Sequence, residues 1–107
     1  MNVFLSEIRQ HAKDGKILFL SHAIRQMSRP ERMISPEEVF EVLRKGEIIE
    51  DYPEDIRGHC CLMLGGKKML HPIHVICSPK EDYLAVITAY RPDPAQWTSD
   101  FRQRRKK

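Results

Sequence analysis

The hydrophobic period of the chain changes at Gly46, and this change constrains the fold more than any other feature of the sequence. Before Gly46, the run from Ser35 to Glu38 is typical of a helix start. Ser35 is the expected cap, Pro36 the first helical residue, and Glu38 closes a capping box three residues after the cap. The following apolar residues recur at helical spacing up to Gly46, where a C-terminal glycine is expected. Beyond Gly46 the spacing is strand-like, so we expect helices first and a sheet second.

Four strands are predicted after this point, each ended by turn residues. They cover Glu47 to Tyr52, His59 to Leu64, Leu70 to Cys77, and Tyr83 to Tyr90. The connections are short, and Gly65-Gly66-Lys67-Lys68 is interpreted as a hairpin turn. Short connections favour an antiparallel meander over crossover units.

Helices are predicted before and after this meander in the sequence. They cover Asn2 to Lys13, Ser21 to Met27 with Ser21 as the cap, and Ala95 to Arg102. In the last one, Trp97 and Phe101 lie four residues apart and can pack back on the sheet. The segment Lys16 to Leu20 is a short apolar run, extended or leading into the next helix. The predicted fold class is therefore α+β, with N-terminal helices packed on a curved four-stranded antiparallel sheet and a C-terminal helix.

Length and composition favour one domain over residues 1–107 of a cytoplasmic protein. The chain has 107 residues, the size of one domain. Its longest apolar run is Ile17-Leu18-Phe19-Leu20, against the ~18 residues that a membrane-spanning helix needs, and the N-terminus lacks the layout of a signal peptide. No contact with a membrane is expected. The three cysteines, Cys60, Cys61 and Cys77, are interpreted as buried apolar side chains of a reducing compartment.

The net charge of +3 is concentrated at the C-terminus. The basic tail, residues 102–107, carries five positive charges, which leaves the rest of the chain net negative. Such a tail can attract a phosphate backbone or an acidic protein, or it can be a solvated terminus. The candidate nucleic-acid-binding residues are Arg91, Arg102, Arg104, Arg105, Lys106 and Lys107.

Metal and nucleotide sites are not expected. His71 and His74 are three residues apart on a predicted strand and so face opposite sides, and the chain contains no Cys-x-x-Cys motif. The turn Gly65 to Lys68 links two strands, whereas a phosphate-binding loop needs a longer glycine spacing and a following helix. We therefore expect no cofactor and no metal.

Five polar residues, His74 among them, are candidates for catalysis. His22 and Arg25 are three apart on a predicted helix and share a face. Thr88 and Tyr90 share a face of the last strand, and His74 joins them if the preceding turn pairs even-numbered with even-numbered positions. Histidine transfers protons near neutral pH and arginine holds phosphate oxygens, so this set suits metal-free phosphodiester chemistry. Each residue also has a structural interpretation, such as a hydrogen-bonded core histidine or a packing tyrosine.

The same residues lie in an ordered series of short motifs that resembles one protein family. The motifs are Ser21-His22-Ala23, Ile34-Ser35, Gly46 to Pro53, Cys61-Leu62, Pro72 to Val75, Ile87 to Tyr90, Pro92-Asp93-Pro94 and Trp97. Together they are similar to the domain-of-unknown-function family 4258 from about Leu20 to Arg105. The resemblance implies the fold of the RelE/ParE-like toxins.

The resemblance also implies a function. It implies the toxin component of a toxin–antitoxin system, a metal-independent endoribonuclease that acts on RNA, with or without the ribosome. The implied partner is an antitoxin, for this family a small zinc-finger and helix-turn-helix protein. His22, His74, Thr88 and Tyr90 match recurrent positions of the family. His22 would be the general base or acid, and His74 would be its counterpart or a phosphate ligand. Tyr90 and Thr88 would position phosphate or stack on a base.

The sequence departs from the family at one point. The family usually places Arg-Met where this chain has Gln26-Met27, and the segment Ser28 to Met33 is longer than usual. Arg25 would then hold the phosphate, or activity has been lost. Two alternatives stay open: a noncatalytic protein- or nucleic-acid-binding module of the same fold, and a polar set whose role is mainly structural.

Overall fold

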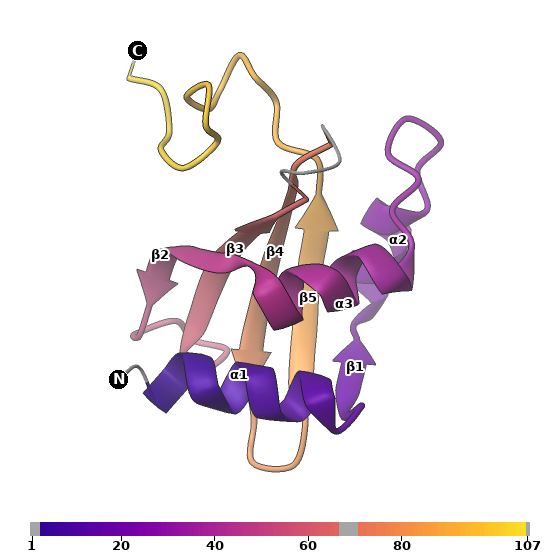
Figure 1. Ribbon diagram of the computed structural model, residues 1–107, viewed down its shortest axis with the longest axis vertical. Coiled ribbons are helices and arrows are strands. Elements are labelled where there is room, and N and C mark those ends of the chain that lie inside the picture. The colour runs from indigo at the N-terminus through magenta and orange to yellow at the C-terminus, as the bar shows by residue number, and fades with distance from the viewer. Residues whose placement is uncertain (1–2, 67–70, 107) are drawn as a thin grey trace.

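The computed structural model describes residues 3–66 and 71–106. These residues form three helices and five strands (Figure 1). In chain order the elements are α1 (Val3–Lys13), β1 (Ile17–Phe19), α2 (Ser21–Met27), α3 (Pro36–Lys45), β2 (Glu47–Tyr52), β3 (Cys60–Gly65), β4 (Ile73–Pro79) and β5 (Leu84–Tyr90). The α+β class is therefore confirmed. The predicted turn residues Lys67 and Lys68 and the predicted strand start at Leu70 lie outside the described ranges.

The sheet has five strands in the order β1-β5-β4-β3-β2, and it is mixed. The prediction of a four-stranded antiparallel sheet was wrong because β1 joins it, parallel to β5, with Ile17 opposite Leu84. The amide of Leu20 extends this pairing by donating to the Val86 carbonyl at 3.0 Å. The two strands are far apart in sequence, so no short turn between them indicates that they pair. The three residues of β1 are also too few to show the alternation typical of a strand.

The helices α1 and α3 cross the same face of the sheet (Figure 1). The core lies between these two helices and the sheet. Buried residues of α1 and α3, such as Ile8, Val39 and Leu43, meet inward residues of β3, β4 and β5, such as Val75. Burying such side chains contributes ~1.5–3 kcal/mol each, which holds the helices on this face. The other face of the sheet is thereby left to the C-terminal part of the chain.

The start of α3 follows the sequence prediction. Ser35 Oγ accepts from the Glu38 amide, Glu38 returns a bond to the Ser35 amide, and Pro36 follows the cap. Gly46 ends the helix in an extended conformation and not in the left-handed one typical of helix ends. A glycine is needed there because a Cβ would lie 2.6 Å from the carbonyl oxygens of Leu64 and Val42. Ser21 is the first residue of α2 and not its cap, since Leu20 occupies the cap position without a side-chain bond.

The predicted helix from Ala95 to Arg102 was wrong. Residues 92–106, named here the C-terminal segment, form turns and one isolated β-bridge between Trp97 and Arg104. The carboxylates of Asp93 and Asp100 accept from backbone amides two residues later at 2.8 and 3.1 Å, and such bonds compete with a helix. Trp97 nevertheless packs inward, as expected, with 3% of its surface exposed.

No helix within the described ranges is both long and apolar enough to cross a membrane.

Candidate functional site

Strand pairing places His74 directly opposite Tyr90, and Ile76 opposite Thr88. The even-to-even pairing expected for these residues is therefore present, but the expectation that the turn itself sets it was wrong, because next to the turn Ser78 pairs with Ala85 and Pro79 with Leu84. A bulge after Ile76 shifts the pairing before the turn, so that Cys77 pairs with Val86. Because α1 and α3 pack on the alternate residues Val75 and Ala89, the side chains of His74, Thr88 and Tyr90 lie on the opposite face of the sheet.

His74 is completely buried on this face, and both of its ring nitrogens are bonded. Nε2 lies 3.0 Å from the carbonyl oxygen of Phe101, and Nδ1 lies 3.1 Å from the hydroxyl oxygen of Tyr90. A carbonyl can only accept, so Nε2 carries a proton and donates it. In the neutral ring Nδ1 then has none and accepts from the Tyr90 hydroxyl. The Phe101 carbonyl thus sets the tautomer of His74 and the direction of the Tyr90 bond.

The C-terminal segment covers this pair. The ring of Trp97 meets His74 edge to face with centroids 4.4 Å apart, and the Arg104 guanidinium lies 4.7 Å from the centre of the Trp97 ring. Phe101, which supplies the carbonyl to His74, has a φ of 61°. A residue other than glycine in this left-handed conformation is strained, and such strain is often found at functional sites.

Burial keeps both members of the pair uncharged near neutral pH. It lowers the pKa of the His74 ring. The bond to Phe101 and the negative charge of Glu50 act in the opposite direction, because both favour the protonated ring. Burial also raises the pKa of Tyr90 to about 12, and the Arg104 charge opposes that rise. Tyr90 itself is only partly buried, so it is the member of the pair that an external molecule can reach.

A carboxylate on β2, which β3 separates from β4, completes the network. Glu50 lies on the same face, accepts from the Tyr52 hydroxyl and pairs with Arg104 at 3.0 Å. Burial by itself raises the pKa of Glu50, but the bonds from Arg104 and Tyr52 contribute to a net lowering. Glu50 is therefore ionised at neutral pH. Its negative charge raises the pKa of His74 and so opposes the effect of burial.

His22 and Arg25, the two predicted site residues on α2, are exposed. Among the described residues, no hydrogen bond, ion pair or ring contact joins either of them to His74 or Tyr90. Thr88 is partly exposed and lies on the same face two residues before Tyr90. The structure thus gathers three of the five predicted residues on one face and leaves the two α2 residues at the surface.

The four arginines among the predicted basic residues are held by carboxylates and carbonyls of the protein. Arg91 pairs with Glu38 at 3.2 Å, and Arg102 with Glu47 at 2.6 Å. Arg105 donates to the Pro94 carbonyl at 2.9 Å, and Lys106 is exposed. Lys107 lies outside the described ranges. The pair of Arg102 with Glu47 is exposed, so it stabilises the fold little and another anion can replace the carboxylate, whereas the Glu50 partner of Arg104 is partly buried.

A second loop is bonded to the residue that follows Tyr90. Arg32, in the turn between α2 and α3, donates to the side-chain oxygen of Gln26. Its main-chain oxygen accepts from Arg91 Nε at 3.1 Å, and its positive charge favours the ionised form of Tyr90. Gln26 is thus bonded to an arginine of the turn between α2 and α3.

Sequence reasoning missed Glu50, Tyr52, Arg32 and the Phe101 carbonyl. Glu50 and Tyr52 could have been found, since residues two apart on a strand share a face and the pairing of β2, β3 and β4 puts that face beside His74. Arg32 and Phe101 act through loop geometry, for which the sequence holds no periodic signal.

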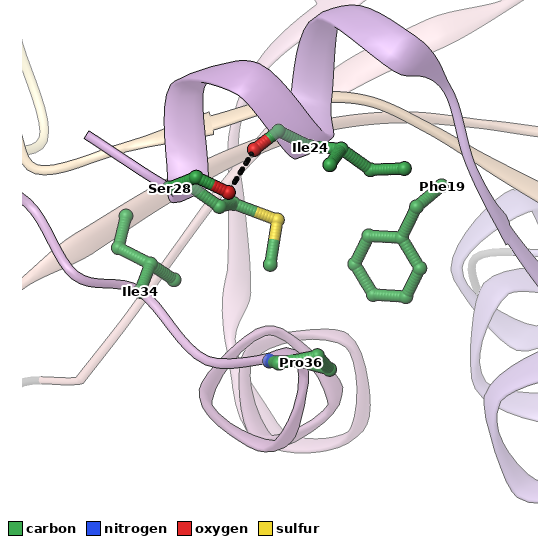
Figure 2. Close-up of a pocket in the computed structure, with 6 residues that line it drawn as sticks. Phe19, Ile24, Ser28, Ile34 and Pro36 are labelled. Atoms are coloured by element: carbon green, nitrogen blue, oxygen red, sulfur yellow. Dashed lines mark hydrogen bonds between the residues drawn. The ribbon is translucent and has the colours of Figure 1, made fainter.

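An apolar pocket of about 270 Å³ lies elsewhere, between α2 and the start of α3. Figure 2 shows Phe19, Ile24, Ile34 and Pro36 around it, with the Ser28 hydroxyl turned back to the Ile24 carbonyl at 2.8 Å. None of its lining residues carries an ionisable side chain. This pocket therefore has no group suited to proton transfer.

Possible metal ligands are not clustered within the described part of the chain, where no three His, Cys, Asp or Glu side chains gather as a metal site requires. The three cysteines are unpaired and buried, as expected.

Comparison with known proteins gives one match. The family model described as Domain of unknown function (DUF4258) matches residues 19–91, which ends before the C-terminal segment and earlier than the Arg105 expected from the motifs. No curated protein and no solved structure matches the chain. Because the family model covers more than half of the sequence, the chain belongs to the family Domain of unknown function (DUF4258).

Proposed function

We propose that the protein is a metal-independent endoribonuclease, the toxin component of a toxin–antitoxin system, and that Tyr90 and His74 together activate a 2′-hydroxyl of RNA. The observation that carries this proposal is the hydrogen bond from the Tyr90 hydroxyl to His74 Nδ1, whose direction is set by the Phe101 carbonyl. A phenol that donates to a basic nitrogen keeps its own oxygen lone pairs available as an acceptor.

The proposed first step is a proton relay. The RNA 2′-hydroxyl donates to Tyr90 Oη, and as its oxygen attacks the adjacent phosphorus, its proton passes to Tyr90 while the Tyr90 proton passes to His74 Nδ1. The bond from phosphorus to the 5′-oxygen of the next nucleotide breaks, leaving a 2′,3′-cyclic phosphate. The exposed His22 is proposed to give the leaving 5′-oxygen its proton.

The surroundings of His74 support this role. The imidazolium formed in the relay keeps its Nε2 bond to the Phe101 carbonyl, and the nearby charge of Glu50 stabilises it. Burial under Trp97 lowers the pKa of the ring and so opposes the imidazolium, an effect that the Phe101 bond and the Glu50 charge offset in part. His74 needs no contact with RNA, since the partly exposed Tyr90 provides it.

Basic residues near the face can hold the RNA backbone. Arg104 lies over the Trp97 ring that covers His74, and Arg102 pairs with Glu47, whose carboxylate is exposed and can be replaced by a phosphate. The RelE/ParE-like fold and the antitoxin partner are part of the proposal and rest on the resemblance of the motifs. The proposed protein partner is a small zinc-finger and helix-turn-helix antitoxin, and the ribosome is a further candidate partner.

Purified full-length protein incubated with RNA in EDTA, alone and with translating ribosomes, tests the proposal. Cleavage that leaves 2′,3′-cyclic phosphate ends is expected in at least one of the two mixtures, together with growth arrest when the protein is expressed without an antitoxin. Absence of cleavage in both mixtures and of growth arrest would refute it.

A noncatalytic binding module is the second candidate, and the complete burial of His74 favours it. A buried histidine with both nitrogens bonded also fits a structural role. In that case His74→Gln and Tyr90→Phe change partner affinity and growth only through stability. Growth arrest by a Tyr90→Phe variant as stable as the wild type would select this candidate.

A further inference from the structure

Arg32 lies in a turn bonded to Arg91, the residue after Tyr90, and no carboxylate neutralises its positive charge within the described part of the chain. Its side chain is partly buried and its Nη1 donates to the amide oxygen of Gln26, a neutral group. The two other arginines of this network differ, because Arg91 and Arg104 each bind a glutamate. A half-buried guanidinium held by an amide is a ready site for an anion.

The backbone around Arg32 is fixed close to the end of β5. The amides of Arg32 and Met33 both donate to the Arg29 carbonyl at 2.9 Å, and Arg91 Nε donates to the Arg32 carbonyl at 3.1 Å. Arg91 directly follows Tyr90 in the sequence. The turn is therefore tied to the strand that carries Tyr90, and Met33 is held there at a φ of 46°.

We propose that Arg32 is the phosphate-binding residue of this site, and that its guanidinium holds the non-bridging oxygens of the phosphodiester whose 2′-hydroxyl is activated by Tyr90. This inference rests on the proposed endoribonuclease function and assigns the substrate's phosphate to a residue of the turn between α2 and α3. One N–H of the guanidinium binds Gln26, which orients the plane, and the remaining donors are available to two phosphate oxygens.

The position of the charge suits the reaction. Attack by the 2′-oxygen adds negative charge to the phosphate oxygens, and a preorganised guanidinium stabilises that charge where it develops. Arg32 also favours the ionised form of Tyr90, so it acts on the residue that takes the proton. Arg25, the arginine expected from the sequence, is exposed on α2 and is assigned no part in phosphate binding here.

The first test uses inorganic phosphate and needs no RNA. Protein labelled with ¹³C-tyrosine is titrated with phosphate at constant ionic strength, and the ring signals of Tyr90 are followed by NMR. A saturable shift is expected for the wild type and for the matched control Arg25→Gln, but not for Arg32→Gln. Arg32→Lys, which keeps the charge without the fork, should retain a weaker shift. An equal shift in Arg32→Gln, or no shift in the wild type, overturns the assignment.

The second test uses a short 2′-O-methyl RNA, which binds but cannot be cleaved. Arg32→Gln should weaken binding about tenfold and reduce the slope of log affinity against log salt by about 1, as loss of one phosphate contact does. Thermal melting identifies any variant that fails to fold, and Arg32→Lys then decides the question. If these effects appear and RNA is not cleaved, the phosphate site stands and the endoribonuclease proposal fails. If RNA is cleaved equally well by Arg32→Gln, the assignment of Arg32 fails alone.

Discussion

Acidification should destabilise the protein through His74, because burial lowers the pKa of this ring in the folded state. The unfolded chain regains the ordinary histidine pKa, about 6.5. As the pH falls below that value, His74 binds a proton in the unfolded state. In the folded state it binds that proton only when the pH reaches its own lower pKa. The stability from His74 is therefore complete above about pH 6.5 and is lost as the pH falls.

The size of the effect follows from one proton. The unfolding free energy should fall by up to about 1.4 kcal/mol for each pH unit between about 6.5 and the folded pKa. Urea denaturation followed by fluorescence measures this directly, since Trp97 is the sole tryptophan and its ring lies 4.4 Å from His74. The measurements should span pH 7 to 5, at each of which a full denaturation curve gives the unfolding free energy.

The variant His74→Gln should lose this part of the pH dependence. Its stability curve should flatten relative to the wild type over the same interval, whatever its absolute stability. His22→Gln is the matched control, because that side chain is exposed and its replacement leaves His74 in place. Parallel curves for the wild type and His74→Gln between pH 7 and 5 would refute the reasoning about the buried ring.

Three further changes test the local interactions. Ser35→Ala removes the helix cap and should cost about 1 kcal/mol of unfolding free energy in urea, whereas Ser35→Asp should keep most of it. Gly46→Ala brings a Cβ to 2.6 Å from the Leu64 carbonyl and should cost about 2 kcal/mol or more; a smaller loss would mean that the junction relaxes. Arg104→Gln removes the ion pair with the partly buried Glu50 and the guanidinium over the Trp97 ring, and should cost about 1–2 kcal/mol while weakening RNA binding in low salt. An unchanged RNA affinity would exclude Arg104 from the interface.

The parts of the fold that could be predicted are those with a local cause. The cap at Ser35 depends on residues three apart, so it is visible in the sequence. The pairing of β4 with β5 also follows from a short turn, but the position of His74 opposite Tyr90 depends in addition on the bulge after Ile76, which the sequence does not mark.

The parts that failed depend on distant or loop contacts. β1 pairs with β5, which is far away in the sequence. Trp97 and Phe101 have helical spacing, but Asp93 and Asp100 bind backbone amides and form turns there instead of a helix. Of the candidate site, the sequence predicted the face with His74, Thr88 and Tyr90. The Phe101 carbonyl could not be foreseen, since a backbone group in a turn has no residue-type signal.

The rate of RNA cleavage by Tyr90→Phe tests the proposed relay most directly. This change removes only the hydroxyl oxygen between the RNA 2′-hydroxyl and His74, and Tyr83→Phe, at an exposed tyrosine, is the matched control. Measured in EDTA at pH 7 on the folded protein, the cleavage rate should fall by about 10²–10⁴ in Tyr90→Phe, the usual loss when a proton-transfer group is removed, and stay at the wild-type value in Tyr83→Phe. Cleavage at the wild-type rate by folded Tyr90→Phe would contradict the relay.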